Sequence, residues 1–79
     1  MSDAIITGFD ARACVCCGGL MITFNGEIKP YEGDFKIIEN GADLGITATD
    51  IFPINVKVDW KVDTTNICNH IIITRFSRR

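Results

Sequence analysis

The residues best suited to chemistry are four cysteines, three of which fall within the run CVCC at positions 14–17. Two glycines follow this run, and the fourth thiol, Cys68, lies two residues before the only histidine, His70. A small apolar residue would fill space without the risk of oxidation, so this crowding needs a chemical reason. The pattern indicates a disulfide staple, a metal site or a reactive thiol.

Covalent geometry limits how the cysteines can pair. Neighbouring Cα atoms lie about 3.8 Å apart, which is shorter than the roughly 4.4 to 6.8 Å that a disulfide spans, so Cys16 and Cys17 should not bond to each other. Cysteines two apart on a strand lie about 6.7 Å apart, near the far limit. The least strained pairing joins Cys14 to Cys17 across a turn and Cys16 to Cys68 across the domain. Such disulfides would act as a structural staple, which is the leading interpretation.

A zinc site is the alternative, because Cys14 and Cys16 would project to the same side of an extended segment. The later pair, Cys68 and His70, has the same spacing and would do likewise on the last strand. On neighbouring strands these side chains offer three sulfur ligands and one nitrogen, a set that suits tetrahedral zinc. The candidate metal ligands are therefore Cys14, Cys16, Cys68 and His70, with Cys17 left over or exchanging with Cys14. The spacing differs from that of paired Cys-x-x-Cys knuckles, so the chain is expected to carry either no cofactor or zinc.

Enzymatic chemistry has little support in the sequence. A redox-active thiolate needs a nearby cation or helix N-terminus, and Arg12 is the only positive side chain close to the cysteine run. No Cys-x-x-Cys stands on a βαβ pattern, and a catalytic pair of a cysteine and His70 would lack any context for an oxyanion hole. The carboxylates form no recognisable acid–base pair, and there is no glycine-rich phosphate loop. We therefore predict a non-enzymatic protein and keep a thiol redox protein as a second alternative.

Short strands are the elements that must position these residues. Most apolar runs are brief, rich in isoleucine, valine, phenylalanine and threonine, and bounded by glycine, proline, asparagine or aspartate. The clearest strand is Ile54–Val62, in which apolar residues, Trp60 among them, alternate with polar ones and form one core-facing side. Further strands are predicted at residues 4–9, 20–24, 29–32, 35–39 and 69–76, with Asn25-Gly26 as a hairpin turn. Between these strands, either a short strand at 44–47 or a helical turn at 49–51 is expected.

These strands predict a single all-β domain covering residues 1–79. Five or six short strands cannot easily leave flat edges exposed, so the economical solution is a small, mainly antiparallel barrel. We expect a barrel of the oligonucleotide/oligosaccharide-binding (OB) type or a related open barrel. A domain of this length buries only roughly 60% of the surface of its unfolded chain, so a cross-link or a metal would add much to its stability.

Composition and charge exclude some classes of protein and disfavour some classes of partner. The chain is 47% hydrophobic with a formal net charge of −2, which excludes a disordered chain and leaves the partner unspecified by charge. Arg75, Arg78 and Arg79 gather near the end, but three arginines on an acidic protein make a weak footprint for nucleic acid. No stretch approaches the about 20 apolar residues of a membrane span. We therefore expect an unidentified ligand or protein partner, and neither nucleic acid nor a transmembrane segment.

Several motifs occur together in this chain. They are Ile6-Thr7-Gly8-Phe9, the run Asp10-x-Arg12-x-Cys14-x-Cys16-Cys17-Gly18-Gly19, Phe52-Pro53 leading into Val58-Asp59-Trp60, the late Cys68 and the closing Ile73-Thr74-Arg75. This combination resembles small uncharacterised bacterial proteins, many of them exported as lipoproteins. The resemblance covers most of the chain and implies an exported or envelope-attached small β domain. Read as a full-length chain, the sequence shows no leader, which predicts the cytoplasm instead.

The leading hypothesis is a small β-barrel that acts as a binding or structural module. Its cysteines are expected to hold the first strands to the last, so Cys68 should lie close to the cysteine run. A zinc-binding protein and a thiol redox protein are the alternatives.

Overall fold

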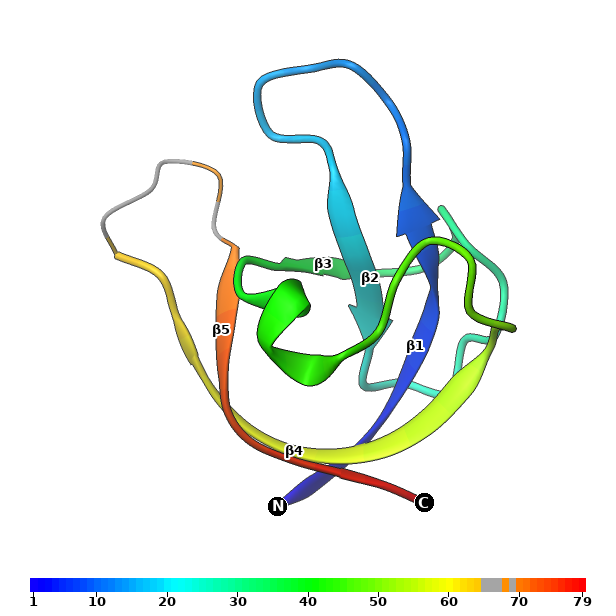
Figure 1. Ribbon diagram of the computed structural model, residues 1–79, viewed down its shortest axis with the longest axis vertical. Coiled ribbons are helices and arrows are strands. Elements are labelled where there is room, and N and C mark those ends of the chain that lie inside the picture. Colours follow the sequence, from blue (N-terminus) through cyan, green and yellow to red (C-terminus); the bar gives the residue numbers. More distant parts are fainter. Residues whose placement is uncertain (65–67, 69) are drawn as a thin grey trace.

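In the part of the chain that the structure describes, five strands close into a barrel (Figure 1). The computed structural model describes residues 1–64, 68 and 70–79. Its elements are β1 (Ser2–Asp10), β2 (Gly19–Thr23), β3 (Lys36–Ile38), the 3-10 helix η1 (Gly41–Leu44), β4 (Ile54–Val62) and β5 (Ile71–Arg78). The strands follow the order β1-β2-β3-β5-β4, and the pairing of β1 with β4 closes the ring.

The strand directions identify the type of barrel. All paired strands are antiparallel except β3 and β5, which run parallel. This connectivity is that of the OB fold, and the prediction of an all-β, mainly antiparallel small barrel is confirmed. It also brings the start of β2 close to the start of β5, because Leu20 pairs with Ile38 of β3 and Ile38 pairs with Ile71. The segments that precede these two strands, which are the loop after β1 and the connection after β4, can therefore meet.

The core lies inside the barrel and is built from alternate positions of the strands. In β4, Ile54, Val56 and Val58 are buried while Asn55 and Lys57 are exposed, as the period of two in the sequence predicts. The largest fully buried side chains of the core cluster come from all five strands: Ile6, Leu20, Ile22, Ile38, Val56, Val58 and Ile71. Burial of one such side chain contributes about 1.5 to 3 kcal/mol, so this interior is the main source of stability.

A side chain completes the barrel where β3 is short. Strand β3 pairs with β5 only through Ile38 and Ile71 in the described residues. Beyond this pair, the Asn40 side chain donates from Nδ2 to the Ile73 carbonyl at 2.8 Å and accepts the Ile73 N–H on Oδ1 at 2.9 Å. The Asn40 amide therefore takes the place of a strand residue and satisfies the backbone of β5.

Trp60 corrects the prediction of a core anchor in β4. The pairing of β4 with β5 shifts register between Asp59 and Trp60, which is the mark of a β-bulge. Beyond the bulge, the apolar side chains of β4 no longer point into the barrel, and Trp60 is 36% exposed. Its ring packs against that of Phe24, with ring centroids 5.1 Å apart.

Three predicted segments differ from the structure. Residues 29–32 form no strand: Pro30 has no N–H to donate, Tyr31 has φ 63°, and β2 pairs with β3 instead. Of the two alternatives for the next segment, the strand at 44–47 is absent, and η1 begins before it at Gly41; near the helical turn expected at 49–51, the Asp50 N–H donates to the Thr47 carbonyl at 3.1 Å and closes a turn. The last strand begins at Ile71, and Asn69, its predicted first residue, lies outside the described residues. No helix in the described part of the chain is long and apolar enough to cross a membrane.

Candidate functional site

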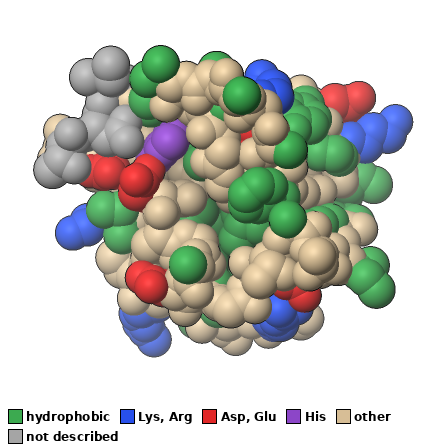
Figure 2. All heavy atoms as spheres, turned by 45° about the horizontal axis from the view of Figure 1, so that its top comes forward, with side chains coloured by type: hydrophobic (Ala, Val, Ile, Leu, Met, Phe, Trp, Pro, Cys, Tyr) green, Lys and Arg blue, Asp and Glu red, His purple; other side chains and the backbone are tan. Residues whose placement is uncertain are grey.

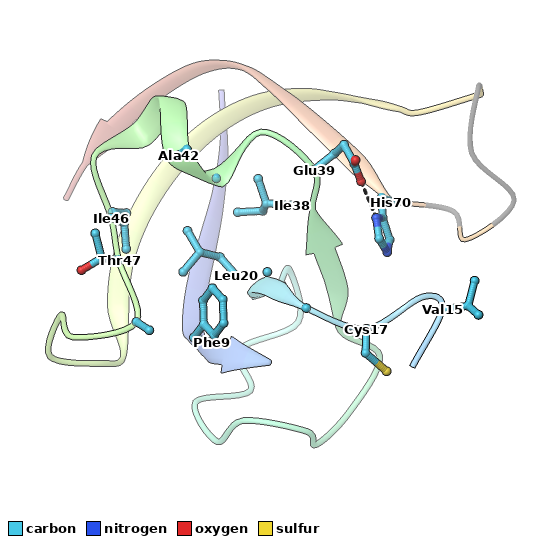
Figure 3. A pocket seen from close by; sticks show the side chains of 14 residues that line it. Phe9, Val15, Cys17, Leu20, Ile38, Glu39, Ala42, Ile46, Thr47 and His70 are labelled. Carbon is cyan, nitrogen blue, oxygen red and sulfur yellow. Dashed lines mark hydrogen bonds and ion pairs between the residues drawn. The ribbon is translucent and has the colours of Figure 1, made fainter. Parts of the chain in front are cut away.

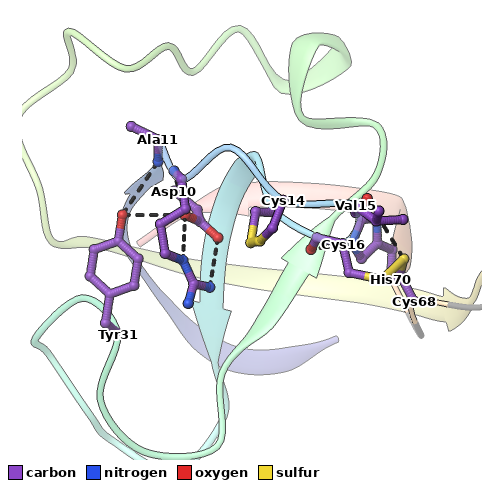
Figure 4. The surroundings of a disulfide bond; sticks show 10 residues. Asp10, Ala11, Cys14, Val15, Cys16, Tyr31, Cys68 and His70 are labelled. Atoms are coloured by element: carbon purple, nitrogen blue, oxygen red, sulfur yellow. Dashed lines mark hydrogen bonds and ion pairs between the residues drawn. A yellow bond between two sulfur atoms is a disulfide. The ribbon is translucent and has the colours of Figure 1, made fainter.

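The four cysteines form two disulfides at one end of the barrel (Figure 4). Cys14 pairs with Cys17 across a Cα separation of 5.0 Å, and the Cys17 N–H donates to the Cys14 carbonyl at 3.1 Å, which closes a tight turn. Cys16 pairs with Cys68 across a Cα separation of 5.2 Å. The predicted pairing is confirmed, including the expectation that Cys16 and Cys17 do not bond to each other.

The bond between Cys16 and Cys68 joins an early connection of the chain to a late one. Its cysteines are 52 positions apart, and they belong to the loop between β1 and β2 and to the connection between β4 and β5. The expectation that Cys68 lies close to the cysteine run is therefore confirmed. The barrel is stapled at the end where these two connections meet.

Asp10 anchors the start of the cysteine loop, and sequence reasoning missed it. Its buried carboxylate accepts hydrogen bonds from the Arg12 backbone N–H and Nε, both at 3.0 Å, and from Arg12 Nη2 at 2.9 Å. The Tyr31 hydroxyl donates to the same carboxylate at 3.3 Å, and the Arg12 guanidinium carbon lies 5.0 Å from the Tyr31 ring centroid. Bonding to Arg12 holds the pKa of Asp10 well below its usual range. The Asp-x-Arg spacing of the motif is the signal that could have revealed this anchor.

His70 joins three parts of the chain at the same end of the barrel. Its Nδ1 lies 2.5 Å from Glu39 Oε2, and its Nε2 lies 3.2 Å from the Cys16 carbonyl oxygen. Both partners are acceptors, so the arrangement favours an imidazolium that donates from both nitrogens. Burial alone would lower the pKa of His70, but the bonds to Glu39 and Cys16 and the charges of Glu39 and Asp63 outweigh burial and raise it.

A pocket of about 620 Å³ opens beside this cluster (Figure 3). Its apolar lining includes Leu20 from β2, Ile38 from β3 and Ile46 from the segment after η1, all of which are buried. Its polar lining includes Glu39 and His70. The pocket therefore has an apolar interior with charged groups at one edge, which is the usual make-up of a site for a small molecule.

Gly19 explains why glycines follow the cysteine run. Gly19 has φ +123°, a backbone conformation that other residues rarely adopt. A Cβ at this position would also meet Ile37 Cγ2 at 2.9 Å and the Ile38 carbonyl oxygen at 3.2 Å. The chain can leave the cysteine loop and enter β2 this close to β3 only with a glycine here.

The predicted metal ligands Cys14, Cys16, Cys68 and His70 lie at the same end of the barrel (Figure 4). The sulfurs are bonded in pairs, whereas a zinc ligand must be a thiolate. Among the described residues, no group of three or more histidine, cysteine, aspartate or glutamate side chains is arranged to hold a metal ion. Zinc binding remains a prediction, and it would require the disulfides to be reduced first.

No family model, curated protein or solved structure matches this chain. The resemblance to small exported bacterial proteins therefore stays a prediction. The barrel, its disulfides and the pocket beside His70 are the observations from which a function can be argued.

Proposed function

We propose that this protein is a non-enzymatic binding module in which a disulfide-stapled β-barrel presents a preformed pocket to a small ligand. The pocket between the cysteine loop, the end of β3 and the segment after η1 is the binding site. The cysteines serve to hold its walls in place. The proposal combines a structural role for the disulfides with a binding role for the barrel end.

The observation that carries the proposal is how the pocket is built. Leu20 and Ile38 are paired across β2 and β3, so the floor of the pocket is part of the hydrophobic core. Its volume of about 620 Å³ lies within the roughly 300 to 1,000 Å³ typical of small-molecule sites. The Cys16–Cys68 bond and the His70–Glu39 pair brace its walls. Little conformational freedom is lost when a ligand enters a site that is already formed.

The state of the nucleophilic groups supports a binding role over catalysis. All four cysteine sulfurs are in disulfides, and neither nitrogen of His70 faces a nucleophile among the described residues. A general base must lie within hydrogen-bond reach of the proton that it removes. Both nitrogens of His70 are hydrogen-bonded within the protein, which fits a bracing role.

The disulfides also support a site of action outside a reducing compartment. Disulfides persist in oxidising environments such as the bacterial periplasm and the cell surface. Two of them in one small domain fit the exported, envelope-attached protein that the sequence resemblance implies.

Nuclear magnetic resonance of the ¹⁵N-labelled protein tests the binding role. Titration with hexan-1-ol should shift the amide signals of Leu20, Ile38 and Ile46, with a millimolar dissociation constant that is usual for so small a ligand. The substitution A42F fills the pocket from η1, since Ala42 is exposed and lines it, and should abolish the shifts. A13F, at an exposed loop position outside the lining, is the control and should leave binding unchanged. Equal binding by A42F and the unsubstituted protein would contradict the proposal.

Zinc binding by the reduced protein is a second candidate. It is favoured by one observation: Cys16 is bonded to Cys68, and the Cys16 carbonyl oxygen lies 3.2 Å from His70 Nε2, so both cysteines and the histidine belong to one part of the barrel end. A phosphine and one water would turn each disulfide into two thiols: the water supplies both thiol hydrogens and the oxygen of the phosphine oxide. If zinc binds, elemental analysis of reduced protein should find about one zinc per chain, and H70A should lower that occupancy. A thiol redox role predicts instead that one disulfide is reduced far faster than the other.

A further inference from the structure

The charged groups around the pocket are mostly acidic. No lysine or arginine lines the pocket in the described part of the chain, whereas Glu39 and His70 do. A second carboxylate belongs to Asp63, whose backbone N–H donates to the His70 carbonyl at 2.8 Å and whose charge acts on the His70 ring. Acidic side chains accordingly lie beside the histidine on the surface (Figure 2). Two carboxylates and one imidazole give the surroundings of His70 a net negative charge even when His70 is protonated, and Glu39 is the carboxylate that lines the pocket itself.

Glu39 and His70 differ in what they can offer to a ligand. Both nitrogens of His70 face protein acceptors, so this side chain has no donor left for an anion. Glu39 engages His70 through Oε2, and its side chain is 43% exposed. In the part of the chain that the structure describes, Oε1 of Glu39 has no protein donor and is available to accept a hydrogen bond from a ligand.

We propose that the pocket takes a ligand with an apolar body and a positively charged amine at one end, with Glu39 as the acceptor for that amine. This inference rests on the proposed function, because it concerns the same pocket. The apolar body would lie against Leu20 and Ile38, and the ammonium group would lie at the negatively charged edge. A carboxylate on the same body would face Glu39 with no donor to replace the water that it loses.

Three probes with one apolar body test this inference: hexylamine, hexan-1-ol and hexanoate. Each is titrated at neutral pH into the ¹⁵N-labelled, disulfide-bonded protein, and its dissociation constant is taken from the shifts of the pocket amides. Hexylamine should bind at least about tenfold more tightly than hexanoate, with hexan-1-ol between them, because a charge pair near a protein surface is only partly screened.

A matched pair of variants tests the role of Glu39. E39Q removes the charge and keeps an acceptor for His70, so the ratio of the hexylamine affinity to the hexanoate affinity, in which any general change of the pocket cancels, should fall to less than about threefold. D43N removes a carboxylate from η1 that does not line the pocket, and it should keep the full preference.

The outcomes separate this inference from the proposed function. Equal affinities of the three probes at the pocket would overturn the amine preference and leave the binding role standing. No shift at the pocket with any probe would overturn both. An amine preference that survives in E39Q, or that disappears in D43N, would overturn the role of Glu39.

Discussion

Removal of the Cys16–Cys68 disulfide should destabilise this protein far more than removal of the Cys14–Cys17 disulfide. In the chain-entropy model, the stabilisation by a disulfide grows with the logarithm of the loop that it closes in the unfolded chain. The cysteines of the first bond are 52 positions apart, which corresponds to about 4 kcal/mol in the free energy of unfolding. Those of the second are 3 apart, which corresponds to less than about 2 kcal/mol.

The double variants C16S/C68S and C14S/C17S make the comparison, and each removes two sulfurs from the same end of the barrel. Urea unfolding can be followed by the fluorescence of Trp60, the only tryptophan, whose ring packs against Phe24. A loss of about 4 kcal/mol is a large share of the roughly 5 to 15 kcal/mol of a typical domain, and it corresponds to a fall in Tm of about 15 to 30 °C. Equal losses in the two variants, or a smaller loss in C16S/C68S, would refute the reasoning.

Further predictions concern side chains whose bonds hold the barrel end. The raised pKa of His70 means that its stabilisation is complete below its ordinary pKa and is lost as pH rises through the folded value, so the free energy of unfolding should fall above about pH 6.5. Urea titrations from pH 6 to 9 should show this fall in the unsubstituted protein and not in H70N; a fall of the same size in H70N would assign it to other groups. The lowered pKa of Asp10 gives the opposite pH dependence: its stabilisation is present above the ordinary pKa of an aspartate and is lost only when pH falls well below it. D10N should therefore have a lower free energy of unfolding at neutral pH, and that free energy should change less with pH in acid. N40A leaves the backbone N–H and carbonyl of Ile73 without their partner and should cost about 1 to 3 kcal/mol in urea unfolding; a loss below about 0.5 kcal/mol would mean that water replaces the amide.

The features that sequence reasoning predicted depend on local geometry. The period of two in Ile54–Val62 gave the bounds of β4 correctly, because alternate side chains of a strand must face opposite sides. The disulfide pairing followed from two distances: neighbouring Cα atoms are too close for a bond between Cys16 and Cys17, and residues two apart on a strand are near the far limit, which disfavours a bond between Cys14 and Cys16. The apolar, β-branched runs were enough to predict a small barrel.

The features that it missed depend on contacts between distant residues. Glu39 and His70 are 31 positions apart, and nothing in the spacing of either predicts their bond. The pattern of β4 continues unbroken through Trp60, so the bulge that turns this side chain outward is visible only in the pairing with β5. Asn25-Gly26 predicted a tight hairpin turn, but these residues form a bend, and β2 pairs with β3 only after a longer connection. Local signals do not determine which strand pairs with which.

The central claim is that the Cys16–Cys68 staple holds a ligand pocket at the end of the barrel. Its most direct test is the dissociation constant of hexan-1-ol for disulfide-bonded protein and for C16S/C68S, measured by nuclear magnetic resonance at a temperature where dispersed signals show that both are folded. C14S/C17S serves as the control for the loss of a disulfide as such. The account predicts binding at Leu20, Ile38 and Ile46 in the disulfide-bonded protein and in the control, and at least about tenfold weaker binding in C16S/C68S. Equal affinity in all three proteins, or no binding to the disulfide-bonded protein, would contradict it.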